Sequence, residues 1–115
     1  IDDESLLDAV TAVSGTGPAY VYLLIDMMIN AAIELGIDAE TARTLVVQTA
    51  RGAAALAAAE KEPIPVLIDR VRSPGGTTTA AFECLDAADV RGIFAEAITS
   101  ARDRARSLAE EARRT

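Results

Sequence analysis

The residues with the clearest chemical potential form one short stretch, Ser-Pro-Gly-Gly-Thr-Thr-Thr at positions 73–79. Gly75 and Gly76 permit backbone conformations that are closed to other residues, and the threonines open an expected helix. Amide groups in the first turn of a helix have no intrahelical acceptor, and the helix dipole is positive there. Together with threonine hydroxyls, they could bind a small anion such as a carboxylate. The alternative from these residues alone is a simple turn with a threonine N-cap.

The elements that must position this stretch are all predicted to be helices. Apolar residues recur at helical spacing along nearly the whole sequence, and no alternating pattern of useful length predicts a strand. Proline, glycine and capping residues divide the pattern into segments. We therefore expect residues 1–115 to form a single all-α domain, a helical bundle of about six helices, at approximately residues 2–13, 19–35, 39–61, 64–71, 78–85 and 90–113.

The helix predicted over residues 19–35 is apolar on almost every side. Its strongly polar residues are Asp26, Asn30 and Glu34, which are spaced four apart and so form one stripe. Such a helix lies at the centre of a bundle or between subunits. We expect a homodimer, because the other short or alanine-rich helices cover this helix poorly. A membrane span is disfavoured, since Asp26 would cost about 3 kcal/mol at the bilayer centre and the uninterrupted apolar runs are short.

Composition argues against several classes of partner. The net charge is −7 with no histidine, whereas nucleic-acid binding depends on clustered Lys and Arg, so no nucleic-acid partner is expected. The arginines in residues 102–114 alternate with acids and are typical of a solvated helix face. Cys84 is the single cysteine, which predicts no internal disulfide, no metal site and a reducing compartment, the cytoplasm. No cationic, apolar leader precedes the first helix in the given residues.

Three segments together resemble one enzyme family. They are DAVTAVSGTGPAY at residues 8–20, QTARGAA at 48–54 and SPGGTT at 73–78. In this order they are similar to the C-terminal domain of pyrroline-5-carboxylate reductase. The resemblance implies an NAD(P)H-dependent oxidoreductase that reduces 1-pyrroline-5-carboxylate to L-proline, the last step of proline biosynthesis. It also implies an interlocked homodimer domain, with higher assemblies of dimers in some members.

The resemblance implies a second domain as well. A Rossmann domain, N-terminal to the given residues, would bind NADPH or NADH. The sequence has no Gly-x-Gly-x-x-Gly followed by a β-α-β pattern, and it begins with Ile1, as a fragment or processed product would. We therefore expect that these 115 residues alone cannot catalyse the reaction.

The same resemblance assigns roles to the Ser-Pro-Gly-Gly stretch. The family's substrate-binding loop falls on five positions here: Ser73, Gly75, Gly76, Thr77 and Thr78. Thr78 matches the threonine whose hydroxyl contacts the ring nitrogen, which makes it the catalytic candidate. A hydroxyl there can orient a C=N bond while hydride reaches the adjacent carbon, with water as the net source of the proton.

Three further positions carry weaker assignments. Glu4 falls where the family places an acid near the substrate, or is only an acid in the first turn of a helix. Arg70 falls near the cofactor, and since its residue type departs from the family's usual one, only a backbone contact is carried over. Arg72 is also unusual at its position; it could add positive charge for a carboxylate, but we expect it to face water.

Two alternatives remain open from the sequence. The chain could be a purely structural helical oligomerisation module in which the glycine stretch is a turn. It could also belong to a related reductase of the same two-domain plan that acts on another cyclic imine.

Overall fold

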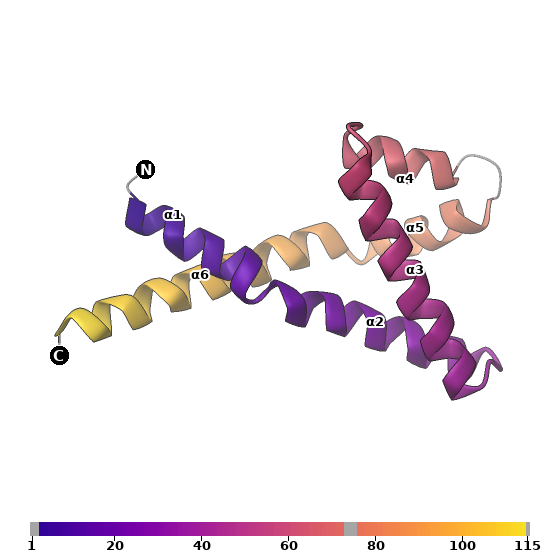
Figure 1. The fold of residues 1–115 in the computed structure, drawn as a ribbon, viewed down its shortest axis with the longest axis horizontal. Helices are drawn as coiled ribbons and strands as arrows, with labels where there is room; N and C mark the ends of the chain where they lie inside the picture. Colours follow the sequence, from indigo (N-terminus) through magenta and orange to yellow (C-terminus); the bar gives the residue numbers. More distant parts are fainter. Residues whose placement is uncertain (1–2, 73–75, 115) are drawn as a thin grey trace. The chain divides into compact units, whose positions relative to one another are not determined.

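The computed structural model describes residues 3–72 and 76–114 of the chain (Figure 1). Its helices are α1 (Asp3–Val10), α2 (Gly17–Glu34), α3 (Ala39–Ala59), α4 (Ile64–Arg72), α5 (Thr77–Ala87) and α6 (Val90–Arg114), with a π-helical turn over Thr11–Gly15. The described residues contain no strand. The predicted all-α fold with about six helices is confirmed, while the single domain stays a prediction.

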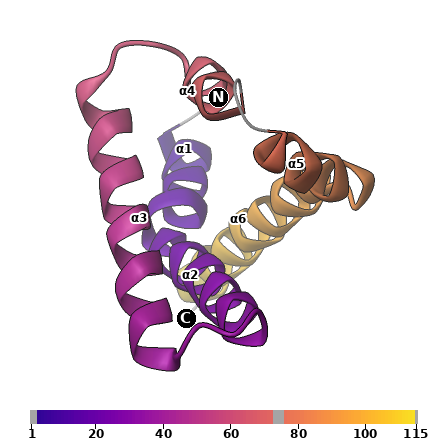
Figure 2. The ribbon, with the colours of Figure 1, turned by 90° about the vertical axis from the view of Figure 1, so that its right-hand side faces the viewer.

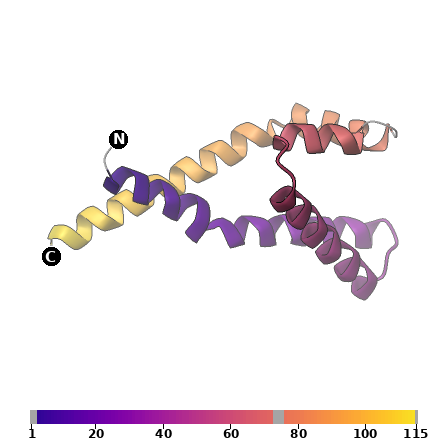
Figure 3. The same cartoon turned by 45° about the horizontal axis from the view of Figure 1, so that its top comes forward.

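The chain forms two compact units, Ile1–Val21 with Cys84–Thr115, and Tyr22–Glu83. In the first unit, α1 and the π turn lie along α6, as Figures 1 and 3 both show. Ala12 in the π turn is fully buried. The Tyr20 ring meets Phe94 of α6 edge-on, with ring centroids 6.1 Å apart. Small and aromatic side chains therefore join the two ends of the chain.

The expected helix break at residues 14–18 is wrong in detail. The helix widens into the π turn, and the Thr16 N–H donates to the carbonyl of Thr11 at 3.0 Å. Thr16 keeps helical dihedral angles, and α2 starts at the next residue. Pro18 has no N–H to donate to the carbonyl four residues earlier. The series of helical hydrogen bonds is therefore interrupted here, although the backbone forms no loop.

In the second unit, a glycine turn joins α2 to α3. Gly36 has φ +102°, and the Ile37 N–H donates to the Ala32 carbonyl at 3.1 Å, the pattern of a Schellman motif. Asp38 then caps α3 by accepting the Thr41 N–H at 3.3 Å. Gly36 and Asp38 thus end α2 and start α3 through their own local backbone and side-chain chemistry.

After α3 the chain turns back through an extended segment before α4, as Figure 2 shows. Glu60 takes ψ 145°, so α3 ends at Ala59, slightly earlier than expected. The prolines at 63 and 65 explain the break, since each lacks an N–H.

Little apolar surface is buried by the described residues. The fully or nearly buried apolar residues are Ala12, Ala42 and Val46, and no large side chain among them is fully buried. Along α2, large apolar side chains stay exposed: Val21, Tyr22, Leu23, Leu24, Met27, Met28 and Ile33. Folding of one chain therefore leaves hydrophobic surface without cover.

By length and composition only, the stretch Asp3–Glu34 is long and apolar enough to cross a membrane, since an 18-residue window in it has a mean hydropathy of 1.2. A helix that packs between subunits has the same length and apolar character. The absence of a membrane partner stays a prediction.

Candidate functional site

The first turn of α5 lies at the end of the Ser-Pro-Gly-Gly stretch. Ser73, Pro74 and Gly75 lie outside the described residues, and Gly76 has φ +63°. The Gly76 carbonyl accepts the Ala80 N–H at 2.9 Å, which closes the first turn. The N–H groups of Thr77, Thr78 and Thr79 have no acceptor within the described part of the chain. The turn therefore presents free donors at the positive end of a helix of 11 residues.

No described atom crowds the position where a side chain of residue 76 would begin. A Cβ atom at Gly76 would meet nothing within 4 Å, so a left-handed backbone, and not crowding, explains the glycine. Thr77 is exposed, whereas Thr78 and Thr79 are half-buried. Their hydroxyls donate no hydrogen bond to any residue that the structure describes. An incoming anion could use both the amides and the hydroxyls.

Arg72, at the end of α4, packs on α5. Its guanidinium carbon lies 5.2 Å from the centre of the Phe82 ring, and both side chains are half-buried. The expectation that Arg72 faces water is wrong, because a cation over an aromatic face is attracted by the ring quadrupole. The contact connects the two helices that flank the Ser-Pro-Gly-Gly stretch.

Arg70 makes ion pairs within the same unit. Its guanidinium lies 3.8 Å from a carboxylate oxygen of Glu60 and 3.7 Å from one of Glu62. The side chain is 52% exposed, so these pairs add little stability. They link α4 to the segment that follows α3. The backbone contact predicted between Arg70 and a cofactor stays a prediction.

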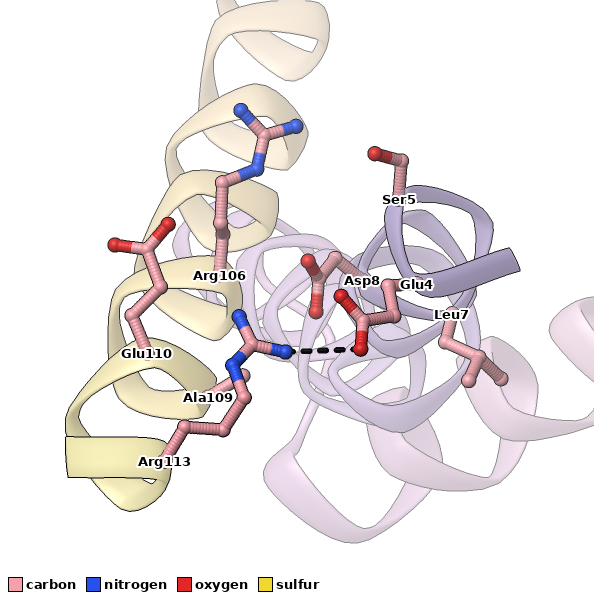
Figure 4. A pocket seen from close by; sticks show the side chains of 8 residues that line it. All are labelled: Glu4, Ser5, Leu7, Asp8, Arg106, Ala109, Glu110 and Arg113. Atoms are coloured by element: carbon pink, nitrogen blue, oxygen red, sulfur yellow. Dashed lines mark ion pairs between the residues drawn. The ribbon is translucent and has the colours of Figure 1, made fainter. Parts of the chain in front are cut away.

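Glu4 lies in the other unit, on α1. Its carboxylate is 2.9 Å from the Arg113 guanidinium of α6, and Figure 4 shows the two side chains pointing toward one another. They line a cavity of about 400 Å³ together with Ser5, Leu7, Asp8, Arg106, Ala109 and Glu110. Glu4 is also in the first turn of α1, as expected of a helix N-terminal acid.

A third feature is an apolar groove between α3 and α4. It has a volume of about 620 Å³ and is lined by Leu56, Ile64, Leu67, Ile68 and Val71 with small residues of α3. Leu56, Ile64 and Val71 are each more than half exposed. The groove is a surface that one chain does not cover.

The described residues hold no group of three or more His, Cys, Asp or Glu side chains placed to bind a metal ion. Cys84 is free and exposed.

Comparison with known proteins decides the family. The sequence profile described as pyrroline-5-carboxylate reductase dimerisation matches residues 4–108. The chain belongs to this family. A pyrroline-5-carboxylate reductase of Pseudomonas aeruginosa is 44% identical over 111 residues, which cover 96% of this chain and 41% of the relative. One from Methanosarcina acetivorans is 39% identical over 108 residues, which cover 94% of this chain and 40% of the relative.

Solved structures agree with the pyrroline-5-carboxylate reductase assignment. The enzyme of Coxiella burnetii superimposes with a TM-score of 0.88 at 38% identity, covering 94% of this chain and 40% of that one. A Plasmodium falciparum pyrroline carboxylate reductase with NADP bound gives a TM-score of 0.87 at 31% identity. The match covers 94% of this chain and 41% of that one. The chain thus spans about two fifths of the length of the relatives that it matches.

Within this pyrroline-5-carboxylate reductase domain, the predicted site residues divide between the two units. Gly76, Thr77 and Thr78 lie together at α5, and Arg70 lies on α4 of the same unit. Glu4 belongs to the other unit. Ser73 and Gly75 fall outside the described residues. Sequence reasoning missed Phe82 and Arg113, since neither stands in a motif and each is identified only by its partner in space.

Proposed function

We propose that this chain is the dimerisation and substrate-binding domain of an NAD(P)H-dependent pyrroline-5-carboxylate reductase, which converts 1-pyrroline-5-carboxylate to L-proline in proline biosynthesis. Family membership supports the reaction, as do relatives that carry this name. The observation that supports the substrate-binding role is that the N–H groups of Thr77, Thr78 and Thr79 have no acceptor among the residues that the structure describes. They match the carboxylate of the substrate in charge and in geometry.

In this proposal the N–H groups at the start of α5 hold the substrate carboxylate, with Ser73, Gly75 and Gly76 shaping the loop. The Thr78 hydroxyl contacts the ring nitrogen and fixes the orientation of the C=N bond. The nicotinamide cofactor, NADPH or NADH, supplies the hydride. The described residues contain no β-α-β unit that fits a dinucleotide. We therefore assign its binding to a separate domain of a longer protein, with a backbone contact at Arg70 and an acid, Glu4, near the substrate.

Replacing Thr78 in the full-length enzyme tests the substrate role. Thr78→Val keeps the shape and removes the hydroxyl, so kcat/KM for 1-pyrroline-5-carboxylate should fall by about 10- to 100-fold. Thr78→Ser should keep most of the activity, because it retains the hydroxyl. The matched control is Thr44→Val on α3, which removes an exposed hydroxyl bonded only to the Glu40 carbonyl. Unchanged kcat and KM in Thr78→Val would leave the hydroxyl without a role.

The same assays separate the alternatives. A purely structural oligomerisation module predicts that Thr78→Val changes nothing. A reductase of another cyclic imine predicts a higher kcat/KM for a larger ring than for the five-membered one. The 115 residues alone should form no proline with NADPH, and measurable turnover would contradict the division of tasks between two domains.

We also propose a homodimer, interlocked through α2 and α3, from which larger assemblies of dimers can form. The exposed apolar side chains of α2 and the groove between α3 and α4 support this. A second subunit would bury both surfaces, at about 25 cal/mol for each Å² of apolar area. The name of the matching family, dimerisation, points the same way.

We propose that the enzyme acts in the cytoplasm without a membrane or nucleic-acid partner. A net charge of −7 opposes binding to phosphate backbones. The free thiol of Cys84 suits a reducing compartment.

A further inference from the structure

Arg72 carries a positive charge that no described carboxylate neutralises. Four other arginines, Arg70, Arg102, Arg104 and Arg113, have acidic partners within 4.0 Å, and the rest have none that close among the described residues. Around Arg72, no carboxylate of the described residues comes that close. Its close contact is instead the face of Phe82, 5.2 Å from the guanidinium carbon to the ring centre. An aromatic ring holds the cation in place but does not cancel its charge.

The position of Phe82 on α5 places this charge beside the first turn. Residues four apart share a helix face, so Phe82 lies on the face of Thr78, one turn later. Long side chains in a helix lean toward its N-terminus, which brings the ring over the turn of Thr78 and Thr79. The guanidinium that stacks on that ring therefore lies on the side of α5 that carries Thr78.

We propose that Arg72 is a specificity-determining residue for the carboxylate of the substrate, with Phe82 as its positioning residue. The inference rests on the proposed function. The free N–H groups of α5 give the anion direction, whereas the Arg72 charge adds attraction that depends on the ligand being negative. An analogue of the same ring with an uncharged amide in place of the carboxylate should therefore gain nothing from Arg72.

The test uses the full-length reductase and two inhibitors that differ in one group, L-proline and L-prolinamide. Arg72→Met keeps a long side chain on Phe82 and removes the charge. We expect the KM for 1-pyrroline-5-carboxylate and the inhibition constant for L-proline to rise by roughly 3- to 10-fold. The kcat should change less than about twofold, and inhibition by L-prolinamide should not weaken. The matched control is Arg43→Met, which removes an exposed arginine of α3 in the same unit.

Two more variants keep the test decisive if Arg72→Met folds poorly. Arg72→Lys keeps the charge and should restore at least half of the lost affinity for L-proline. Phe82→Leu frees the guanidinium and should weaken inhibition by L-proline, by a smaller factor than Arg72→Met does. Inhibition by L-prolinamide should not weaken in this variant.

Each outcome is decisive. Unchanged L-proline inhibition in folded Arg72→Met, or in folded Phe82→Leu where Arg72→Met does not fold, would overturn the role of Arg72 while the proposed reductase stands. An equal loss for L-proline and L-prolinamide would show a role in shape alone, which also overturns it. Absence of 1-pyrroline-5-carboxylate reduction by the unmodified enzyme would overturn the proposed function and this inference together.

Discussion

At the scale of a single residue, the hydroxyl of Tyr20 stabilises the π turn. It donates a hydrogen bond of 2.9 Å to the carbonyl of Ala12, a residue with no exposed surface. A π turn shifts the helical ladder by one residue, so a carbonyl there needs another donor. We expect Tyr20→Phe to lower the free energy of unfolding by about 1 kcal/mol, measured by urea denaturation at fixed protein concentration.

The chain offers a matched control for this measurement. Tyr22 lies in the same helix as Tyr20 and is 69% exposed. Its hydroxyl makes no hydrogen bond to a residue that the structure describes. Tyr22→Phe should leave the free energy of unfolding within about 0.5 kcal/mol of the original. Equal effects of the two substitutions would show that the Ala12 bond contributes nothing.

At the scale of an element, the start of α3 should respond to pH. Hydrogen bonds from the Thr41 side chain and then from its backbone N–H lower the pKa of Asp38 below its ordinary value of 3.8. A lowered pKa in the folded state means that this cap stabilises the fold fully above that ordinary value. The stabilisation is lost as the pH falls through the lower, folded pKa.

Asp38→Asn isolates this effect, because asparagine also caps helices but does not titrate. Urea denaturation of both proteins from pH 7 to about pH 2.5 should show the advantage of Asp38 over the asparagine variant shrinking only below about pH 4. Comparing the two proteins removes the contribution of the other carboxylates. Parallel curves over the whole range would contradict the assignment of the cap.

At the scale of the whole molecule, the exposed apolar side chains of α2 predict how subunits associate. Leu24 is 50% exposed in one chain, and burying a leucine against a partner contributes about 1.5–3 kcal/mol. Leu24→Asp should therefore raise the dissociation constant of the dimer more than about 10-fold, as measured by light scattering and sedimentation.

Asn30→Asp adds the same charge on the polar stripe of α2 and should leave the dimer intact. The stripe of Asp26, Asn30 and Glu34 is the one face of α2 that already carries acids. A monomeric original protein at micromolar concentration, or a Leu24→Asp variant that still dimerises tightly, would contradict a dimer formed through α2.

Much of the candidate site could be predicted because its signals are local. Gly76 takes the left-handed backbone that glycine permits, and the threonines after it open a helix, as expected. The partners of the charged residues could not be predicted. Arg72 meets Phe82 from another helix, and Glu4 meets Arg113 from the opposite end of the chain. Such pairs depend on where helices lie in space, which residue spacing along one helix does not encode.

The sequence by itself determined the helices of this protein and most of their ends. Gly36, Asp38 and the prolines at 63 and 65 act on their immediate backbone, through a permitted φ, a side-chain cap and a missing N–H. Only the tertiary structure decided that Thr11–Gly15 widens into a π turn and that Arg72 rests on a ring instead of facing water. Both depend on packing between helices, whose energy is set by neighbours distant in sequence.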